Sequence, residues 1–152
     1  MSEPRWLNAE EQRAWRAYLE STILLFDALD RQLQREAGLP HTYYEILVRL
    51  SEASARTLRM SELAQATRSS RSRLSHAVAR LEERGWVRRR DCATDRRGQL
   101  AELTDAGFAV LEAAAPGHVA AVRRHVIDRL DADQIAQLAA IGEAIVAGAV
   151  ED

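Results

Sequence analysis

Apolar side chains recur every three or four residues over most of the chain, a spacing that predicts amphipathic helices. Gly38 should end the first helix and Gly85 the fourth, while Thr42, with Glu45 three residues later, forms a capping pattern for the second. Thr104 can cap the fifth helix. The six expected helices span residues 7–37, 42–53, 60–67, 70–84, 104–130 and 131–150.

Two short β-strands are expected between the fourth and fifth helices. Residues 86–91 and 99–103 are strand-like, and a polar loop with Gly98 near its end joins them. Three helices followed by a hairpin are the order of a winged helix-turn-helix. The sequence therefore predicts a single, mainly α domain over residues 1–152 with a small β-hairpin wing. Its DNA-binding lobe should span residues 42–103, between flanking helices at 7–38 and 104–150.

The last expected helix carries an apolar stripe close to the end of the chain, where a small monomer has little left to cover it. We therefore expect a second subunit to cover the stripe, which makes the protein a homodimer and the flanking segments its dimerisation helices. The stripe consists of Ile135, Leu138, Ile141, Ile145 and Val146.

Composition argues against several classes of protein. The chain has 152 residues, 47% of them hydrophobic, and no uncharged stretch approaches the roughly 20 apolar residues that span a bilayer, so no membrane partner is expected. No secretory signal is recognisable, which favours a cytoplasmic protein. Cys92 is the single cysteine and allows no intramolecular disulfide. Motifs for phosphate cradling, nucleophilic catalysis or zinc hydrolysis are missing from the sequence, so we expect neither an enzyme nor a cofactor or metal site.

The charge is divided steeply along the chain, although the net charge is only −2. Residues 56–97 contain twelve arginines against five acidic residues, a local balance of +7, and the remainder carries −9. All 21 basic residues are arginine, whose planar guanidinium group suits phosphate and the edge of guanine. A basic centre within a helix-turn-helix indicates double-stranded DNA as a partner.

The fourth expected helix has one face to anchor it and another to enter a major groove. At 100° per residue, Leu74, Val78 and Leu81 cluster on one side, with small, polar and basic residues opposite. Small residues permit close approach to the bases, and arginine offers guanine a bidentate contact. The candidates for base readout are Arg71, Ser72, Arg73, Ser75 and His76. Those for phosphate contact are Ser70, Arg80, Arg88, Arg89 and Arg90.

The expected wing is densely basic. Arg88, Arg89 and Arg90 lie on one strand, and Arg96 and Arg97 lie at the turn. Five guanidinium groups on a projecting hairpin should repel one another unless a polyanion is nearby. The wing therefore strengthens the DNA-binding interpretation.

Four short motifs point to a known family. They are Ser61-Glu62-Leu63-Ala64, Leu81-Glu82-Glu83-Arg84-Gly85-Trp86-Val87, Asp95-Arg96-Arg97 and Leu103-Thr104-Asp105-Ala106-Gly107. With these motifs in this order, the chain resembles the multiple antibiotic resistance regulator (MarR) family of dimeric winged helix-turn-helix transcription factors. The resemblance implies a sequence-specific regulator, expected to be a repressor, that reads a pseudo-palindromic operator. It also implies a dimer in which the first helix interleaves with the last two.

The resemblance assigns roles at the wing. In this family an Asp-x-Arg signature places an arginine in the minor groove and an aspartate steadies it, which implies these roles for Arg97 and Asp95, with Arg96 as the adjacent alternative. The chain departs from the family before the third helix, where members commonly have a small polar cap and this sequence has Arg59-Met60. That departure concerns helix capping rather than the fold.

Many members of the family also bind a small aromatic molecule between the dimerisation helices and the DNA-binding lobe. The equivalent segments here contain five residues that could line such a pocket: Trp15, Tyr18, His41, Tyr43 and Tyr44. Aromatic side chains at helical spacing are more often ordinary interface core, and both interpretations stay open.

Two alternative functions stay open beside this one. Cys92 lies beside arginines that favour its thiolate, which would suit a redox-responsive regulator, although the chain has no second cysteine to resolve it. The Arg/Ser-rich stretch at 68–75 could instead belong to a non-specific nucleic-acid-binding module, although it overlaps a helical core face. His118 and His125 are expected to be surface or interface histidines rather than metal ligands.

Overall fold

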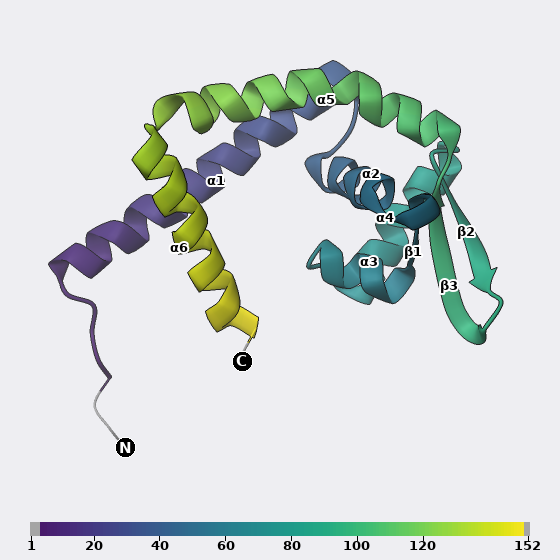
Figure 1. The fold of residues 1–152 in the computed structure, drawn as a ribbon, viewed down its shortest axis with the longest axis horizontal. Coiled ribbons are helices and arrows are strands. Elements are labelled where there is room, and N and C mark those ends of the chain that lie inside the picture. Colours follow the sequence, from purple (N-terminus) through teal and green to yellow (C-terminus); the bar gives the residue numbers. More distant parts are fainter. Residues whose placement is uncertain (1–3, 151–152) are drawn as a thin grey trace.

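A lobe of short elements and a pair of long helices make up the computed structural model of the chain, which describes residues 4–150, with the backbone alone for residues 95–97. Helices α1 and α5 pack together over part of their length, and the lobe lies below one end of the pair while α6 descends from the other (Figure 1). The elements are α1 (Ala9–Ala37), α2 (His41–Glu52), η1 (Ser54–Arg56), β1 (Thr57–Arg59), α3 (Met60–Ala66), α4 (Arg71–Glu83), β2 (Val87–Cys92), β3 (Asp95–Leu103), α5 (Asp105–His125), η2 (Ile127–Arg129) and α6 (Ala132–Val150).

Helix α1 begins at Ala9, two residues later than expected, because Asn8 is its N-cap. The Asn8 side chain accepts from the backbone N–H of Glu11 at 2.9 Å, and the Glu11 carboxylate accepts from that of Asn8 at 2.8 Å. At the other end, Gly38 adopts the left-handed conformation (φ 60°) that a side chain disfavours. The predicted stop is therefore confirmed.

Helix α2 begins at His41, and the expectation that Thr42 caps it is wrong. Asp30 of α1 reaches across the turn, and its Oδ1 accepts from the backbone N–H of His41 at 2.8 Å. A carboxylate eleven residues earlier therefore satisfies a free N–H group of α2 and ties the lobe to α1.

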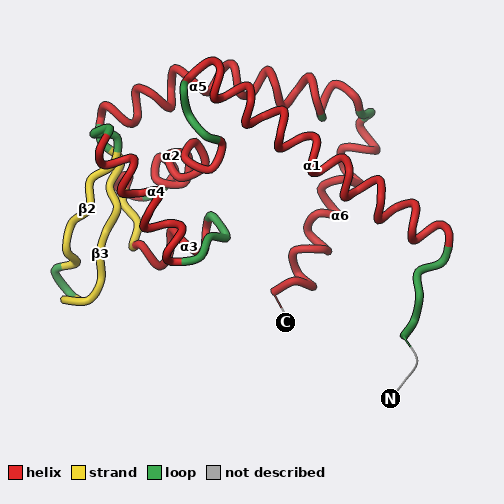
Figure 2. Tube along the Cα trace, turned by 180° about the vertical axis from the view of Figure 1, so that it is seen from behind, coloured by secondary structure: helices red, strands yellow, loops and turns green. Residues whose placement is uncertain are grey.

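The wing is part of a three-stranded antiparallel sheet in the order β1-β3-β2, with one strand more than the predicted hairpin. Strand β1 pairs with β3 through Leu58 opposite Ala101. The connection between β2 and β3 is a tight turn, so β3 begins at Asp95 and Gly98 lies within the strand rather than in a loop. The two longer strands project beyond the lobe (Figure 2).

The core of the lobe fixes the orientation of α4. Leu74, Val78 and Leu81 are at most 1% exposed, as the helical projection predicted. They pack with residues from α2, α3, the sheet and the end of α1 in one continuous cluster. Truncating a fully buried leucine of this kind typically costs about 2–5 kcal/mol, so the helix is held firmly with its opposite face outward.

Helix α5 joins the lobe to the far end of the molecule. Thr104 caps it as predicted, accepting from the backbone N–H of Gly107 at 3.0 Å, and the helix runs through Pro116 without interruption. Asp131 accepts from the backbone N–H of Gln134 at 2.8 Å at the start of α6. The predicted capping of α5 by Thr104 is therefore confirmed, and the sixth helix starts close to where it was expected.

No residue of α6 is buried in the single chain. By length and composition alone α6, with a mean hydropathy of 1.2, could cross a membrane. No such helix was expected from the sequence, because no uncharged stretch approaches the roughly 20 apolar residues that span a bilayer. The large apolar side chains that α6 exposes are Ile135, Leu138, Ile141, Ile145, Val146 and Val150.

Candidate nucleic-acid interface

Helices α3 and α4 form a helix-turn-helix whose second helix is capped by Ser70. The hydroxyl of Ser70 accepts from the backbone N–H of Arg73 at 3.2 Å. Before α3, the Glu62 carboxylate accepts from the backbone N–H of Arg59 at 3.0 Å, which replaces the small polar cap common in the resembled family. Ser70 thus lies at the positive end of α4, where free N–H groups can meet a phosphate.

The outward face of α4 carries every residue expected to read bases, and all of them are exposed. Ser72, Arg73 and His76 lie on the side away from the buried leucines and valine, whereas Arg71 and Ser75 lie on the flank that faces the wing. A major groove could therefore receive the helix without disturbing the core. These residues are Arg71, Ser72, Arg73, Ser75 and His76.

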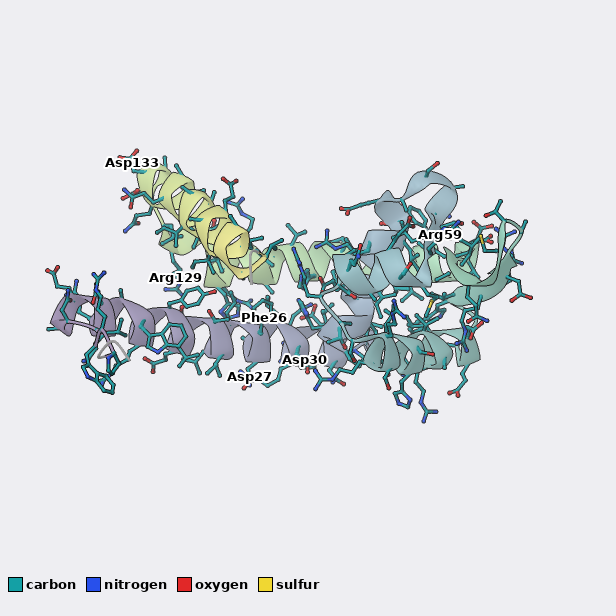
Figure 3. All side chains as sticks on the ribbon, turned by 90° about the horizontal axis from the view of Figure 1, so that it is seen from below. Phe26, Asp27, Asp30, Arg59, Arg129 and Asp133 are labelled. Carbon is teal, nitrogen blue, oxygen red and sulfur yellow. The ribbon has the colours of Figure 1, made fainter. Side chains whose placement is uncertain are left out.

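A groove of about 410 Å³ separates α4 from the wing. Arg71 and Ser75 line it from α4, Arg59 from the start of α3, and Gln99 from β3. Arg59 also donates to the Thr94 hydroxyl at the wing turn (3.3 Å), and it lies at the end of the molecule remote from Arg129 (Figure 3). Sequence reasoning missed Arg59 and Gln99 because only the fold brings them beside α4; the signal available was the place of Arg59 among the twelve central arginines.

The arginines of β2 are paired with carboxylates. Glu102 on the adjacent strand accepts a hydrogen bond from Arg88 at 2.9 Å, and its other oxygen lies 2.8 Å from the guanidinium group of Arg90 in an ion pair. Arg89 pairs with Glu82 of α4 at 2.6 Å. The premise that these guanidinium groups repel one another is therefore wrong, because the strand register, which the sequence did not reveal, places Glu102 between two of them.

The phosphate candidate Arg80 is exposed on α4. Its guanidinium group lies 2.9 Å from the Glu83 carboxylate, and this hydrogen bond raises the pKa of Arg80. The side chains of Asp95, Arg96 and Arg97, assigned to the minor groove, lie outside the part of the chain that the structure describes. Their backbone opens β3 directly after the wing turn, at the projecting end of the sheet.

Two of the five aromatic-pocket residues meet where the lobe joins the long helices. Tyr44 of α2 packs on His118 of α5 with ring centroids 4.5 Å apart, and His41 lies 5.6 Å from the same imidazole and 5.4 Å from Phe26 of α1. Burial, and secondarily the neighbouring His41, lowers the pKa of His118, and burial raises the pKa of Tyr44. His118 and Tyr44 therefore stay uncharged near neutral pH, and the cluster holds α1, α2 and α5 together.

The structure separates the other three pocket residues from this cluster. Trp15 and Tyr18 lie on the exposed side of α1 with ring centroids 6.3 Å apart. Tyr18 also lines a mainly apolar groove of about 320 Å³ between α1 and the ends of α5 and α6, together with Phe26 and Arg129. Tyr43 lines a different groove, beside the outward face of α4. One chain therefore does not gather the five residues into one cavity.

The histidines and the cysteine occupy separate places. His125 lines the groove beside Tyr18, whereas His118 packs on Tyr44. Among the described residues, no group of three or more histidine, cysteine or acidic side chains is arranged to hold a metal ion. Cys92 is half-buried at the end of β2, with its Sγ 3.2 Å from the Thr94 hydroxyl.

Known proteins resemble this chain in both sequence and structure. A family model described as MarR family matches residues 37–98. The structure of Sco3205, a MarR family transcriptional regulator from Streptomyces coelicolor in complex with DNA, is 59% identical, with a TM-score of 0.93 over 95% of this chain and 91% of that one. This chain belongs to the MarR family.

Other relatives are similar over different lengths. AbsC, a MarR family transcriptional regulator from the same organism, is 44% identical with a TM-score of 0.93, over 98% of this chain and 100% of that one. The transcriptional repressor MprA of Escherichia coli is 31% identical over 85 residues, which are 56% of this chain and 48% of that protein. The chain thus spans about half the length of the curated relatives it matches. The winged-helix fold predicted from the sequence is confirmed.

Proposed function

We propose that this chain is a transcriptional regulator that binds a pseudo-palindromic DNA site as a homodimer. The observation that carries the proposal is the outward face of α4, which is polar, basic and exposed while its inner face is locked into the core. A relative of 59% identity, Sco3205, has been solved in complex with DNA, which supports the same partner here. Two copies of α4 would enter successive major grooves, with half-site centres about 10 base pairs apart.

The side chains divide by role. Arg71, Arg73 and His76, with Ser72 and Ser75, read base edges in the major groove. Ser70 and Arg80, together with the arginines of β2, contact phosphates and fix the register. Arg97 enters the minor groove, Asp95 steadies it, and Arg96 is the adjacent alternative.

Dimerisation is supported by the apolar surface that one chain leaves uncovered. α6 exposes its stripe, and α1 exposes Trp15, Leu19 and Ile23. A second copy would cover both surfaces and close the groove beside Tyr18. This occupant also suits α6 better than a bilayer does, because Asp133 and Glu143 lie within the helix.

We propose that the protein represses transcription and that it does so in the cytoplasm. A dimer seated on an operator blocks a promoter by occupancy, and the relative MprA is named a repressor. The His118 cluster lies where the lobe meets the long helices, so a small aromatic effector inserted there would alter the spacing of the two α4 helices. Regulation through Cys92 is the alternative, and no enzymatic activity is part of the proposal.

Arg73→Ala tests the assignment of base readout. We expect the variant to lose preference at one position in each half-site, a discrimination worth about 1–3 kcal/mol, because a bidentate arginine contact is removed. Binding of an operator and its single-base variants measures this preference. Arg31→Ala, an exposed arginine of α1, is the control and should keep the wild-type preference. An unchanged preference in Arg73→Ala would remove the assignment.

A further inference from the structure

Glu82 and Arg89 connect α4 to the wing. Glu82 lies in the last turn of α4, and its Oε1 accepts from the backbone N–H of Arg89 on β2 at 2.9 Å. Its Oε2 accepts from Nε of the same arginine at 2.6 Å. The Arg89 Nη1 extends towards the Ser75 hydroxyl on the outward face of α4, at 3.5 Å. Both carboxylate oxygens are thus engaged by one residue of the wing.

This pair differs from the other ion pairs of the same surface. Arg80–Glu83 lies within α4, and the pairs of Glu102 lie within the sheet. Among the ion pairs of the described side chains, Arg89–Glu82 alone links α4 to the wing. It is also better shielded, with both side chains under 30% exposed against more than 50% for Arg80 and Glu83. Shielding from water and salt strengthens an ion pair.

Neither of the other contacts that hold the wing fixes it to α4. The hydrogen bond from Arg59 to Thr94 holds the wing turn to the start of α3, and the buried apolar contacts of the wing lie at its root. Val87, Ala101 and Leu103 are buried there, while the hairpin beyond them projects from the lobe (Figure 2). A contact on the flank of β2 fixes the angle between hairpin and helix. That angle sets the distance between the DNA contacts of α4 and those of the wing tip. If the angle is already fixed in the free protein, less conformational entropy is lost when DNA binds.

We infer that Glu82 is a positioning residue for DNA binding, which holds the wing through Arg89 at the angle that lets α4 and the wing engage DNA together. The inference rests on the proposed function. It also changes the role assigned to Arg89, whose guanidinium group is committed to Glu82 rather than to a phosphate.

The test compares Glu82→Gln with Glu83→Gln. Both variants remove one carboxylate from the same turn of α4, so both relieve repulsion of DNA to a similar extent, but only the first breaks the link to the wing. On a site selected by the wild-type chain, we expect Glu82→Gln to bind about tenfold more weakly than Glu83→Gln, since a charge-assisted contact is lost.

Footprints of the saturated complexes separate positioning from simple loss of stability. In Glu82→Gln, hydroxyl-radical protection of the flanking minor groove should disappear while protection of guanine N7 in the major groove persists. Glu83→Gln should keep both. A merely destabilised protein would bind less, but its bound molecules would give the wild-type pattern.

Several outcomes would overturn the inference. One is equal affinity for the two variants with the flanking protection intact in both. Another is tighter binding by Glu82→Gln with a steeper salt dependence, which would mean that Glu82 only withholds Arg89 from phosphate.

Two further experiments cover the cases in which Glu82→Gln does not fold or the wild-type chain binds no specific duplex. If Glu82→Gln does not fold, Arg89→Lys keeps a cation opposite Glu82 without the Nε–H contact and should partly lose the flanking protection; full protection would overturn the inference. If the wild-type chain selects no duplex, the proposed function fails before any variant is made, and the inference falls with it.

Discussion

Gly107→Ala should lower the free energy of unfolding by about 3 kcal/mol, the size of a severe overpacking defect. A Cβ at this position would overlap the carbonyl oxygen of Trp86 and lie 2.7 Å from Cδ1 of Leu103. The carbonyl cannot move freely, because it accepts from the backbone N–H of Thr104 at 3.0 Å. The first turn of α5 therefore packs against the root of the wing at a distance that only glycine permits.

Denaturant titration of Gly107→Ala measures this loss, with Gly148→Ala as the matched control. Gly148 lies in α6, and a Cβ added there would meet no atom of its own chain within 4 Å, so alanine should be neutral or stabilise the helix by about 0.5–1 kcal/mol. Equal unfolding midpoints for the two variants would show that α5 and the wing root are not packed as described.

Ile141→Asp should convert the protein to a monomer and weaken operator binding by about a hundredfold or more. Ile141 is 54% exposed on the apolar stripe of α6, and a carboxylate there would be buried unpaired if a second copy covers the stripe. The loss of DNA affinity follows because two linked half-site contacts become two independent ones. Sedimentation of the protein and titration of an operator measure the two effects.

Ala140→Asp is the control for this variant. Ala140 precedes Ile141 directly and lies on a different side of α6, so the same charge enters the same helix without meeting the stripe. We expect Ala140→Asp to remain dimeric and to bind as the wild type does. A dimeric Ile141→Asp, or a wild-type chain that is itself monomeric, would contradict the proposed interface.

Local sequence patterns predicted those features of the fold that depend on one helix alone. The periodicity of Leu74, Val78 and Leu81 identified the buried face of α4, and Thr104 was identified as a cap from its place before an apolar run. Both depend on residues within one or two turns. The same helical projection also predicted the face of α4 that contacts DNA in the proposed function.

Contacts between distant segments were not predictable in this way. Strand β1 is three residues long and exists because β3 lies beside it, and the first free N–H of α2 is satisfied by Asp30 of the preceding helix. The pairing of Glu102 with Arg88 depends on the strand register. The sequence alone therefore overestimated the electrostatic repulsion among the arginines of the wing.

Selection of duplexes from a random pool at two salt concentrations, with the mass of the bound complex measured alongside, tests the central claim most directly. The account predicts recovery of a pseudo-palindrome with half-site centres about 10 base pairs apart, bound by two chains and retained at the higher salt concentration. Binding without sequence preference that vanishes at moderate salt would contradict it, because the basic centre would then be an electrostatic platform rather than a reader of bases.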